Sequence, residues 1–184
     1  MTDEQKAVVF LDFIDLLKSS GSWCGETHVQ KGTYFLQEVT KVPLGFEFVF
    51  YKHGPYSFDL NDEITSLMAD LMLAVKAREP YGPTILLGEN SQSFLDRYPR
   101  TRKQFRHQAE FIAARLGKKN VKELERLATA LFVTRNELPR ASLEARASRV
   151  NELKPHFTLD EARAAVAEVD GLIANAEPFV RSSN

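Results

Sequence analysis

The sequence predicts a mainly helical fold with a small amount of β-structure, on three observations. Apolar residues recur at helical spacing along most of the chain, and helix-capping patterns precede several of these stretches. Two short segments, 46–51 and 84–87, have the character of strands. The first half then has the order helix, helix, strand, helix, strand, which is that of a winged helix with an extra strand. We expect a winged-helix-like lobe over residues 1–98 and a helical-bundle lobe over 99–184, packed as one compact unit.

Composition limits the function classes. The chain has 184 residues, of which 43% are hydrophobic and 27% charged, enough for a buried core and a charged surface. Its net charge of -1 argues against general nucleic-acid coating, so any such binding needs a local basic patch. A single cysteine, Cys24, excludes an internal disulfide. With an acidic N-terminus and no apolar run of about 20 residues, we expect a cytoplasmic protein without a membrane partner.

The first expected helix runs from Thr2 to Lys18, where Thr2 and Gln5 can form a capping box. Asp12 and Asp15 are expected to mark a narrow solvent edge. Such a helix is buried on more than one side, inside the domain or in a homodimer interface, and we expect a homodimer. Its apolar residues cover most of the circumference: Val8, Val9, Phe10, Leu11, Phe13, Ile14, Leu16 and Leu17.

A second helix is expected over 26–39, where the central Gly32 suggests close approach of another backbone. In the strand 46–51, three phenylalanines alternate with other residues, and Gly54-Pro55 is expected to break it. Ser57 can then cap a third helix that runs to about Val75. Its buried stripe is expected to be Leu60, Ile64, Leu67, Met68 and Leu71.

The turn 80–83 leads to the strand 84–87, after which the chain is expected to be helical. Asn120 with Glu123, and Thr158 with Glu161, form further capping-box patterns. Short connections between these helices suggest a bundle packed on the first lobe. The expected helices span 101–116, 120–131, 142–153 and 158 onward.

Three segments carry a family resemblance: Gln30–Gln37, Phe50–Ser57 and Leu153–Thr158. They resemble the YwgA-like bacterial and phage-associated proteins and, more distantly, the Panacea (SocA-like) antitoxin domain. The resemblance implies a winged-helix-like fold without known enzymatic activity. For the Panacea relatives it implies neutralising a toxin, or serving as an adaptor, through protein contacts. Gly32 departs from the large apolar residue usual at that place in the second helix.

The expected third helix is acidic, carrying Asp59, Asp62, Glu63 and Asp70, with no lysine or arginine between Ser57 and Val75. In a DNA-reading winged helix this element enters the major groove, where four carboxylates would repel the phosphates. The acidic residues form either a solvated face or a surface for a basic protein.

A basic segment follows, with Arg97, Arg100, Arg102, Lys103 and Arg106 uninterrupted by acids and His107 beside them. Three interpretations stay open: a solvated face, docking of an acidic protein, or phosphate and nucleic-acid binding. We expect nucleic-acid binding by this segment to be weak or absent.

No catalytic, metal or cofactor motif stands out. Cys24 and His28 could form an activated thiol, but a small buried cysteine is the commoner case. In the corner 51–57, a helix cap and a packed aromatic turn are favoured over anion binding. We therefore expect a non-enzymatic, antitoxin- or adaptor-like interaction protein, with a toxin as one possible partner. The alternative is a DNA-binding regulator that uses Arg97–His107. The expected partner surface is Tyr56, Ser57, Asp59, Asp62, Glu63 and Asp70.

Overall fold

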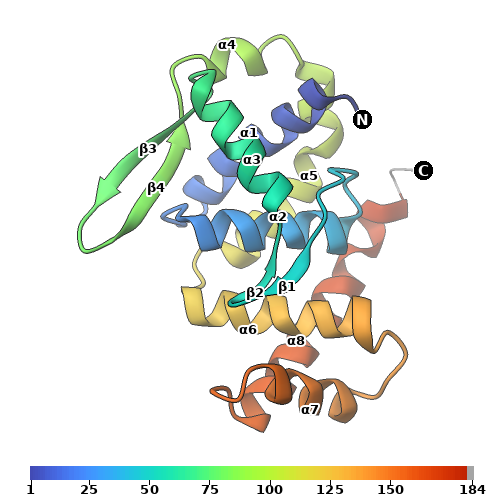
Figure 1. Ribbon diagram of the computed structural model, residues 1–184. Helices are drawn as coiled ribbons and strands as arrows, with labels where there is room; N and C mark the ends of the chain where they lie inside the picture. The colour runs from blue at the N-terminus through green and yellow to red at the C-terminus, as the bar shows by residue number, and fades with distance from the viewer. Residues whose placement is uncertain (182–184) are drawn as a thin grey trace.

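The computed structural model describes residues 1–181 and is mainly helical, as predicted (Figure 1). Two short antiparallel hairpins, β1–β2 and β3–β4, supply its β-structure within these residues. In chain order the elements are α1 (Asp3–Ser19), α2 (Glu26–Thr40), β1 (Val49–Tyr51), β2 (Gly54–Tyr56), α3 (Phe58–Ala69), β3 (Leu73–Arg78), β4 (Tyr81–Leu87), α4 (Ser91–Leu95), α5 (Pro99–Leu116), α6 (Val121–Phe132), the π-helical turn η1 (Val133–Glu137), α7 (Leu143–Leu153) and α8 (Leu159–Arg181).

Helix α2 is the central element. It crosses the middle of the molecule and packs against α5, α6, α8 and β2 (Figure 1). Because α5, α6 and α8 come from the second half of the chain, the two halves share one continuous apolar core. Helices α6, α7 and α8 also pack against one another. Within residues 1–181, no helix is long and apolar enough to cross a membrane.

Helix α1 is buried inside the chain itself. It begins at the predicted capping box of Thr2 and Gln5 and packs against α4, α5 and β4. These neighbours cover both the apolar residues and their flanks, so every one of the eight predicted apolar positions is buried. The apolar surface of α1 that motivated the homodimer prediction is therefore already buried within one chain.

Phe13 and Leu17 of α1 explain the glycine in α2. A Cβ atom at Gly32 would lie 3.0 Å from the Phe13 ring and 3.3 Å from a Leu17 methyl group. The close approach at Gly32 is thus made by side chains of α1, and the expectation of a neighbouring backbone was wrong.

The observed strand β1 is shorter than the predicted strand 46–51, and a second strand follows it. Phe46, Phe48 and Phe50 are more buried than their neighbours, as the alternation predicted, but the ladder covers only Val49–Tyr51. The strand ends before Gly54-Pro55, as predicted, but these residues then begin a second strand, β2, with Pro55 opposite Phe50. Gly54 has φ +85°, a left-handed conformation that suits glycine and allows the tight reversal.

Helix α3 ends at Ala69, and the predicted extension to Val75 was wrong. Leu71 adopts φ +57°, and the Leu71 and Met72 amides donate to the Met68 and Leu67 carbonyls. This is a Schellman arrangement, which usually uses glycine and is therefore hard to anticipate at a leucine. The chain turns directly into the β3–β4 hairpin, which projects from the helical body (Figure 1).

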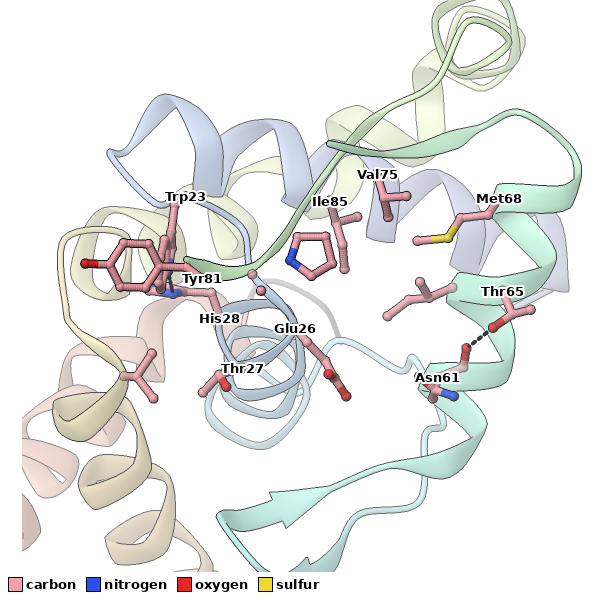
Figure 2. A pocket seen from close by; sticks show the side chains of 15 residues that line it. Trp23, Glu26, Thr27, His28, Asn61, Thr65, Met68, Val75, Tyr81 and Ile85 are labelled. Atoms are coloured by element: carbon pink, nitrogen blue, oxygen red, sulfur yellow. Dashed lines mark hydrogen bonds between the residues drawn. The ribbon is translucent and has the colours of Figure 1, made fainter. Parts of the chain in front are cut away.

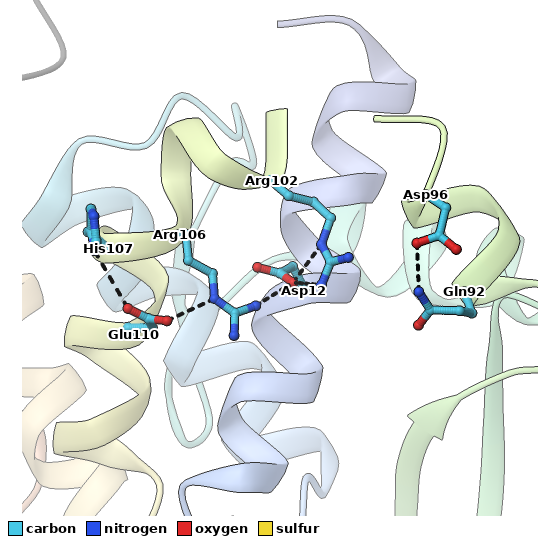
Figure 3. Close-up of polar contacts among 7 residues, drawn as sticks. All are labelled: Asp12, Gln92, Asp96, Arg102, Arg106, His107 and Glu110. Atoms are coloured by element: carbon cyan, nitrogen blue, oxygen red, sulfur yellow. Dashed lines mark hydrogen bonds and ion pairs between the residues drawn. The ribbon is translucent and has the colours of Figure 1, made fainter. Parts of the chain in front are cut away.

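A buried ion-pair cluster joins α1 to α5 (Figure 3). Asp12, only 2% exposed, accepts hydrogen bonds from Arg102 at 3.0 and 2.9 Å and from Arg106 at 2.8 Å. Arg106 also donates to Glu110 at 2.8 Å. Asp12 was predicted to lie at a solvent edge, and that prediction was wrong because two arginines, 90 and 94 residues further along the chain, cover it. Asp15 is exposed, as predicted.

Replacing both arginines by glutamine should destabilise the fold. The double change Arg102→Gln and Arg106→Gln leaves the Asp12 carboxylate buried without a cation, which costs about 3 kcal/mol. Urea unfolding followed by circular dichroism measures the loss. The pair Arg100→Gln and Lys103→Gln removes the same charge from exposed positions on α5 and should change stability by less than about 0.5 kcal/mol. Equal stability of the two double variants would contradict a structural role for the cluster.

Candidate partner-binding surface

Two adjacent side chains of α2 hold the segment that leads into α3. The buried Gln30 amide bonds both main-chain groups of Ser57: its Nε2 donates to the Ser57 carbonyl and its Oε1 accepts from the Ser57 amide, each at 3.0 Å. Next to it, the buried Lys31 Nζ donates to the Pro55 carbonyl at 2.6 Å. Residues 55–57 are therefore fixed to α2 by three hydrogen bonds.

A second buried amine holds the turn of the β1–β2 hairpin. Lys154, just after α7, donates to the Lys52 carbonyl and lies 2.7 Å from a carboxylate oxygen of Glu125 in α6. Both Lys154 and Glu125 are buried. The pKa of Lys31 is lowered to about 8, mainly by burial; the charge of Glu125 opposes this shift and that of Lys154 adds to it. The buried amines of Lys31 and Lys154 therefore hold the β1–β2 hairpin, and Glu125 pairs with Lys154.

Three aromatic rings pack together where the β1–β2 hairpin meets the start of α3. The ring centroids of Tyr51, Tyr56 and Phe58 lie 5.1 to 6.1 Å apart in tilted and edge-to-face contacts. Tyr51 and Phe58 nevertheless remain 49% and 55% exposed. The Tyr56 hydroxyl donates to Glu26 of α2 at 3.3 Å, and a hollow of about 250 Å³ lies beside the rings.

Two of the predicted acidic residues follow Phe58 in the first turns of α3. Asp59 and Asp62 are both exposed, and Asp59 accepts a hydrogen bond from the Glu47 amide at 3.4 Å. Burial, and then the negative charge of Glu26, raise the pKa of Tyr56, with a smaller contribution from Asp62. We call the set Glu26, Tyr51, Tyr56, Phe58, Asp59 and Asp62 the aromatic–acidic corner.

The other predicted surface residues lie elsewhere. Ser57 is fully buried and caps α3 by accepting from the Leu60 amide at 3.1 Å, so it offers no surface to a partner. Glu63 is half-buried, and burial together with the charge of Asp3 raises its pKa. Asp70 is the C-terminal cap of α3, where its carbonyl accepts from Asn90 at 3.0 Å. The predicted acidic face is therefore divided between the corner and the side that faces the start of α1.

A second hollow, of about 460 Å³, lies between α2, α3 and the β3–β4 hairpin (Figure 2). Ile64, Met68 and Ile85 line its apolar part. At one end Trp23 donates to His28 Nδ1 at 2.9 Å, and burial lowers the pKa of His28 and favours its neutral form. This hollow was not predicted, because its lining comes from four separated segments of the sequence.

The predicted basic patch is not continuous. Arg102 and Arg106 are committed to Asp12, and Arg97 lies over the Phe94 ring at 5.0 Å. Arg100 and Lys103 remain exposed on α5. The patch available to a partner is therefore smaller than the run of basic residues in the sequence.

The Cys24–His28 pair does not form an activated thiol. Cys24 is buried with its Sγ directed at the Ile14 carbonyl, 3.7 Å away, and burial raises the pKa of the thiol. His28 instead bonds Trp23. Across residues 1–181, no group of three or more histidine, cysteine, aspartate or glutamate side chains is arranged to hold a metal ion.

No protein-family model and no curated protein matches the chain. The motif residues behind the family resemblance nonetheless have a physical role here, because Gln30 and Lys31 bind the main chain of Pro55 and Ser57. That role requires no relative to establish it.

Lys31 should make stability depend on pH in the alkaline range. Because its pKa is about 8 in the folded chain and about 10.5 when unfolded, the unfolded state binds more protons between these values. Stability from this group therefore rises with pH there. Relative to Lys31→Met, the wild-type free energy of unfolding should increase by about 2 kcal/mol from pH 8 to pH 10. Urea unfolding at both pH values measures this, and a constant difference would contradict a buried, charge-destabilised amine.

Proposed function

We propose that this chain is a non-enzymatic, antitoxin- or adaptor-like interaction protein that binds a basic segment of a protein partner at the aromatic–acidic corner. Within the proposal, α1, α2, α3 and the β3–β4 hairpin form a winged-helix-like lobe, with the hairpin in the place of the wing. A relationship to the YwgA-like and Panacea proteins belongs to the same proposal.

The observation that carries this proposal is the exposure of Tyr51 and Phe58 at 49% and 55%. Large aromatic side chains gain most from burial, and they dominate the energetics of protein interfaces. Here the rings are held in mutual contact and backed by the Gln30 and Lys31 hydrogen bonds. A rigid exposed cluster loses little entropy on binding, which suits an interface centre.

Charge indicates the chemistry of the partner. Glu26 accepts a hydrogen bond from Tyr56, Asp62 is near enough to raise the pKa of Tyr56, and Asp59 directly follows Phe58 at the start of α3. The basic groups that line the adjoining hollow are Lys31, Lys52 and His53, and the Lys52 amine lies 6.0 Å from the centre of the Tyr51 ring. An arginine or lysine of a partner could lie over a ring face and pair with a carboxylate, a combination favourable by about 0.5–2 kcal/mol when water is excluded. We therefore propose a basic partner segment.

The alternative, a DNA-binding regulator using Arg97–His107, has less support. Two of its five basic side chains are held by a buried aspartate, and helix α3 remains without a basic residue. Reading of a DNA groove by α3 would place Asp59 and Asp62 against phosphates, which is repulsive.

Site-specific photo-crosslinking in cells tests the proposed surface. A photoreactive phenylalanine analogue at position 58 should capture one defined protein, whereas the same analogue at Gln104, exposed on α5, should not. The captured protein, once purified, should bind the wild type with measurable affinity. Capture of the same protein at both positions would place the interface outside the corner.

Charge reversal then tests the role of the carboxylates. Asp59→Lys with Asp62→Lys should weaken binding of the captured partner at least about tenfold, because two attractive contacts become repulsive. Asp70→Lys with Glu89→Lys makes the same change of charge at exposed positions away from the corner and should leave affinity within about twofold. Calorimetry on folded variants measures both, and equal effects would contradict the proposal.

A further inference from the structure

Basic side chains from three separated segments gather around Trp23. Two hollows, of about 470 and 620 Å³, share Gly21, Trp23 and Arg78 in their linings. We call the basic residues that line them the Trp23 basic surface: Lys18 at the end of α1, Lys76 and Arg78 of β3, Lys118 and Lys119 between α5 and α6, and Lys122 at the start of α6.

Four of these six charges are free of acidic partners. Lys119 pairs with Glu168 at 2.8 Å, and Lys122 lies 3.8 Å from Glu161. Among residues 1–181, no carboxylate lies within ion-pair distance of Lys18, Lys76, Arg78 or Lys118. The N-terminus of α6 lines the hollow of about 470 Å³, but the Glu123 carboxylate already accepts from the Asn120 amide there at 2.8 Å, so the positive potential comes from the four free cations. In a chain of net charge -1, this is a concentrated local patch.

An exposed aromatic ring stands at the edge of the same surface. The Arg78 guanidinium lies 4.3 Å from the Trp23 ring and 5.4 Å from the Tyr81 ring, and the two rings are 5.3 Å apart. Tyr81 remains 59% exposed on the projecting hairpin (Figure 2). Its ring is therefore held in place from behind while much of it faces solvent.

We propose that the Trp23 basic surface binds single-stranded nucleic acid. Lys18, Lys76, Arg78 and Lys118 would neutralise successive phosphates along the two hollows, and Tyr81 would stack on an unpaired base. Basic grooves with aromatic platforms are how proteins bind single strands without reading sequence. A duplex encloses its bases and would leave Tyr81 without this role. The proposal is independent of the aromatic–acidic corner, which shares no residue with this surface.

Fluorescence anisotropy with a labelled 12-nucleotide oligothymidine tests the proposal on the full chain. Four phosphate contacts on a single strand predict a slope of about -2.8 in a plot of log affinity against log salt. Affinity should therefore fall about 50-fold between 50 and 200 mM salt. No binding at 50 mM salt would overturn the proposal.

Matched pairs of substitutions locate the site. Lys76→Gln with Lys118→Gln should halve the slope to about -1.4, because two of the four contacts are lost. Arg100→Gln with Lys103→Gln changes the net charge equally but lies on α5, and it should leave slope and affinity unchanged. An equal effect of both pairs would show a nonspecific charge effect and overturn the assignment.

Tyr81→Leu separates base stacking from phosphate binding. The leucine keeps an apolar side chain beside Trp23, yet binding of the oligothymidine should weaken at least about fivefold, since stacking on one base is lost. Three results would overturn the single-strand assignment: an unchanged affinity of Tyr81→Leu, a duplex of the same length bound as tightly as the single strand, or an oligoglutamate peptide bound more tightly than either.

Discussion

The fixing of residues 55–57 to helix α2 is the constraint on which both the β1–β2 hairpin and the start of α3 depend. Gln30 matches the donor and acceptor of Ser57, and Lys31 takes the carbonyl of Pro55. A buried polar group without a hydrogen-bond partner destabilises the fold. Moving residues 55–57 away from α2 would leave both of these side chains without their partners. Ser57 can then cap α3, and the rings of Tyr51 and Phe58 are held at the surface.

The same packing separates two surfaces of different charge. At the start of α3, Asp59 and Asp62 follow the exposed ring of Phe58. Around Trp23, unpaired lysines and Arg78 lie near the exposed Tyr81. Arg102 and Arg106 of α5, which belong in sequence to a third, basic surface, instead neutralise Asp12. A basic residue in this sequence therefore indicates a binding surface only if it has no acidic partner in the fold. A paired arginine stabilises the fold, whereas an unpaired one is available to a ligand.

Much of the fold follows from local patterns, and the rest depends on distant contacts. The capping boxes at Thr2 and Asn120 and the helical periodicity predict the starts of α1 and α6 correctly, because these signals act within one turn. The Schellman turn at Leu71 has no glycine to reveal it. The burial of Asp12 depends on residues 90 positions away, and the Trp23 basic surface depends on three segments. Tyr56, Asp59 and Asp62 were predicted as surface residues, whereas Ser57 was not recognisable as buried because its partner Gln30 lies in another helix.

Hydrogen exchange in a Gln30→Ala variant tests most directly whether α2 holds the corner in place. If the account is correct, the amides of Ser57 and Leu60 lose protection strongly, since the first loses its acceptor and the second depends on the Ser57 side chain. Amides in the middle of α1 and α5, which do not rely on Gln30, should keep their protection. Unchanged protection at Ser57 and Leu60 in a folded Gln30→Ala variant would contradict the central role of this interaction.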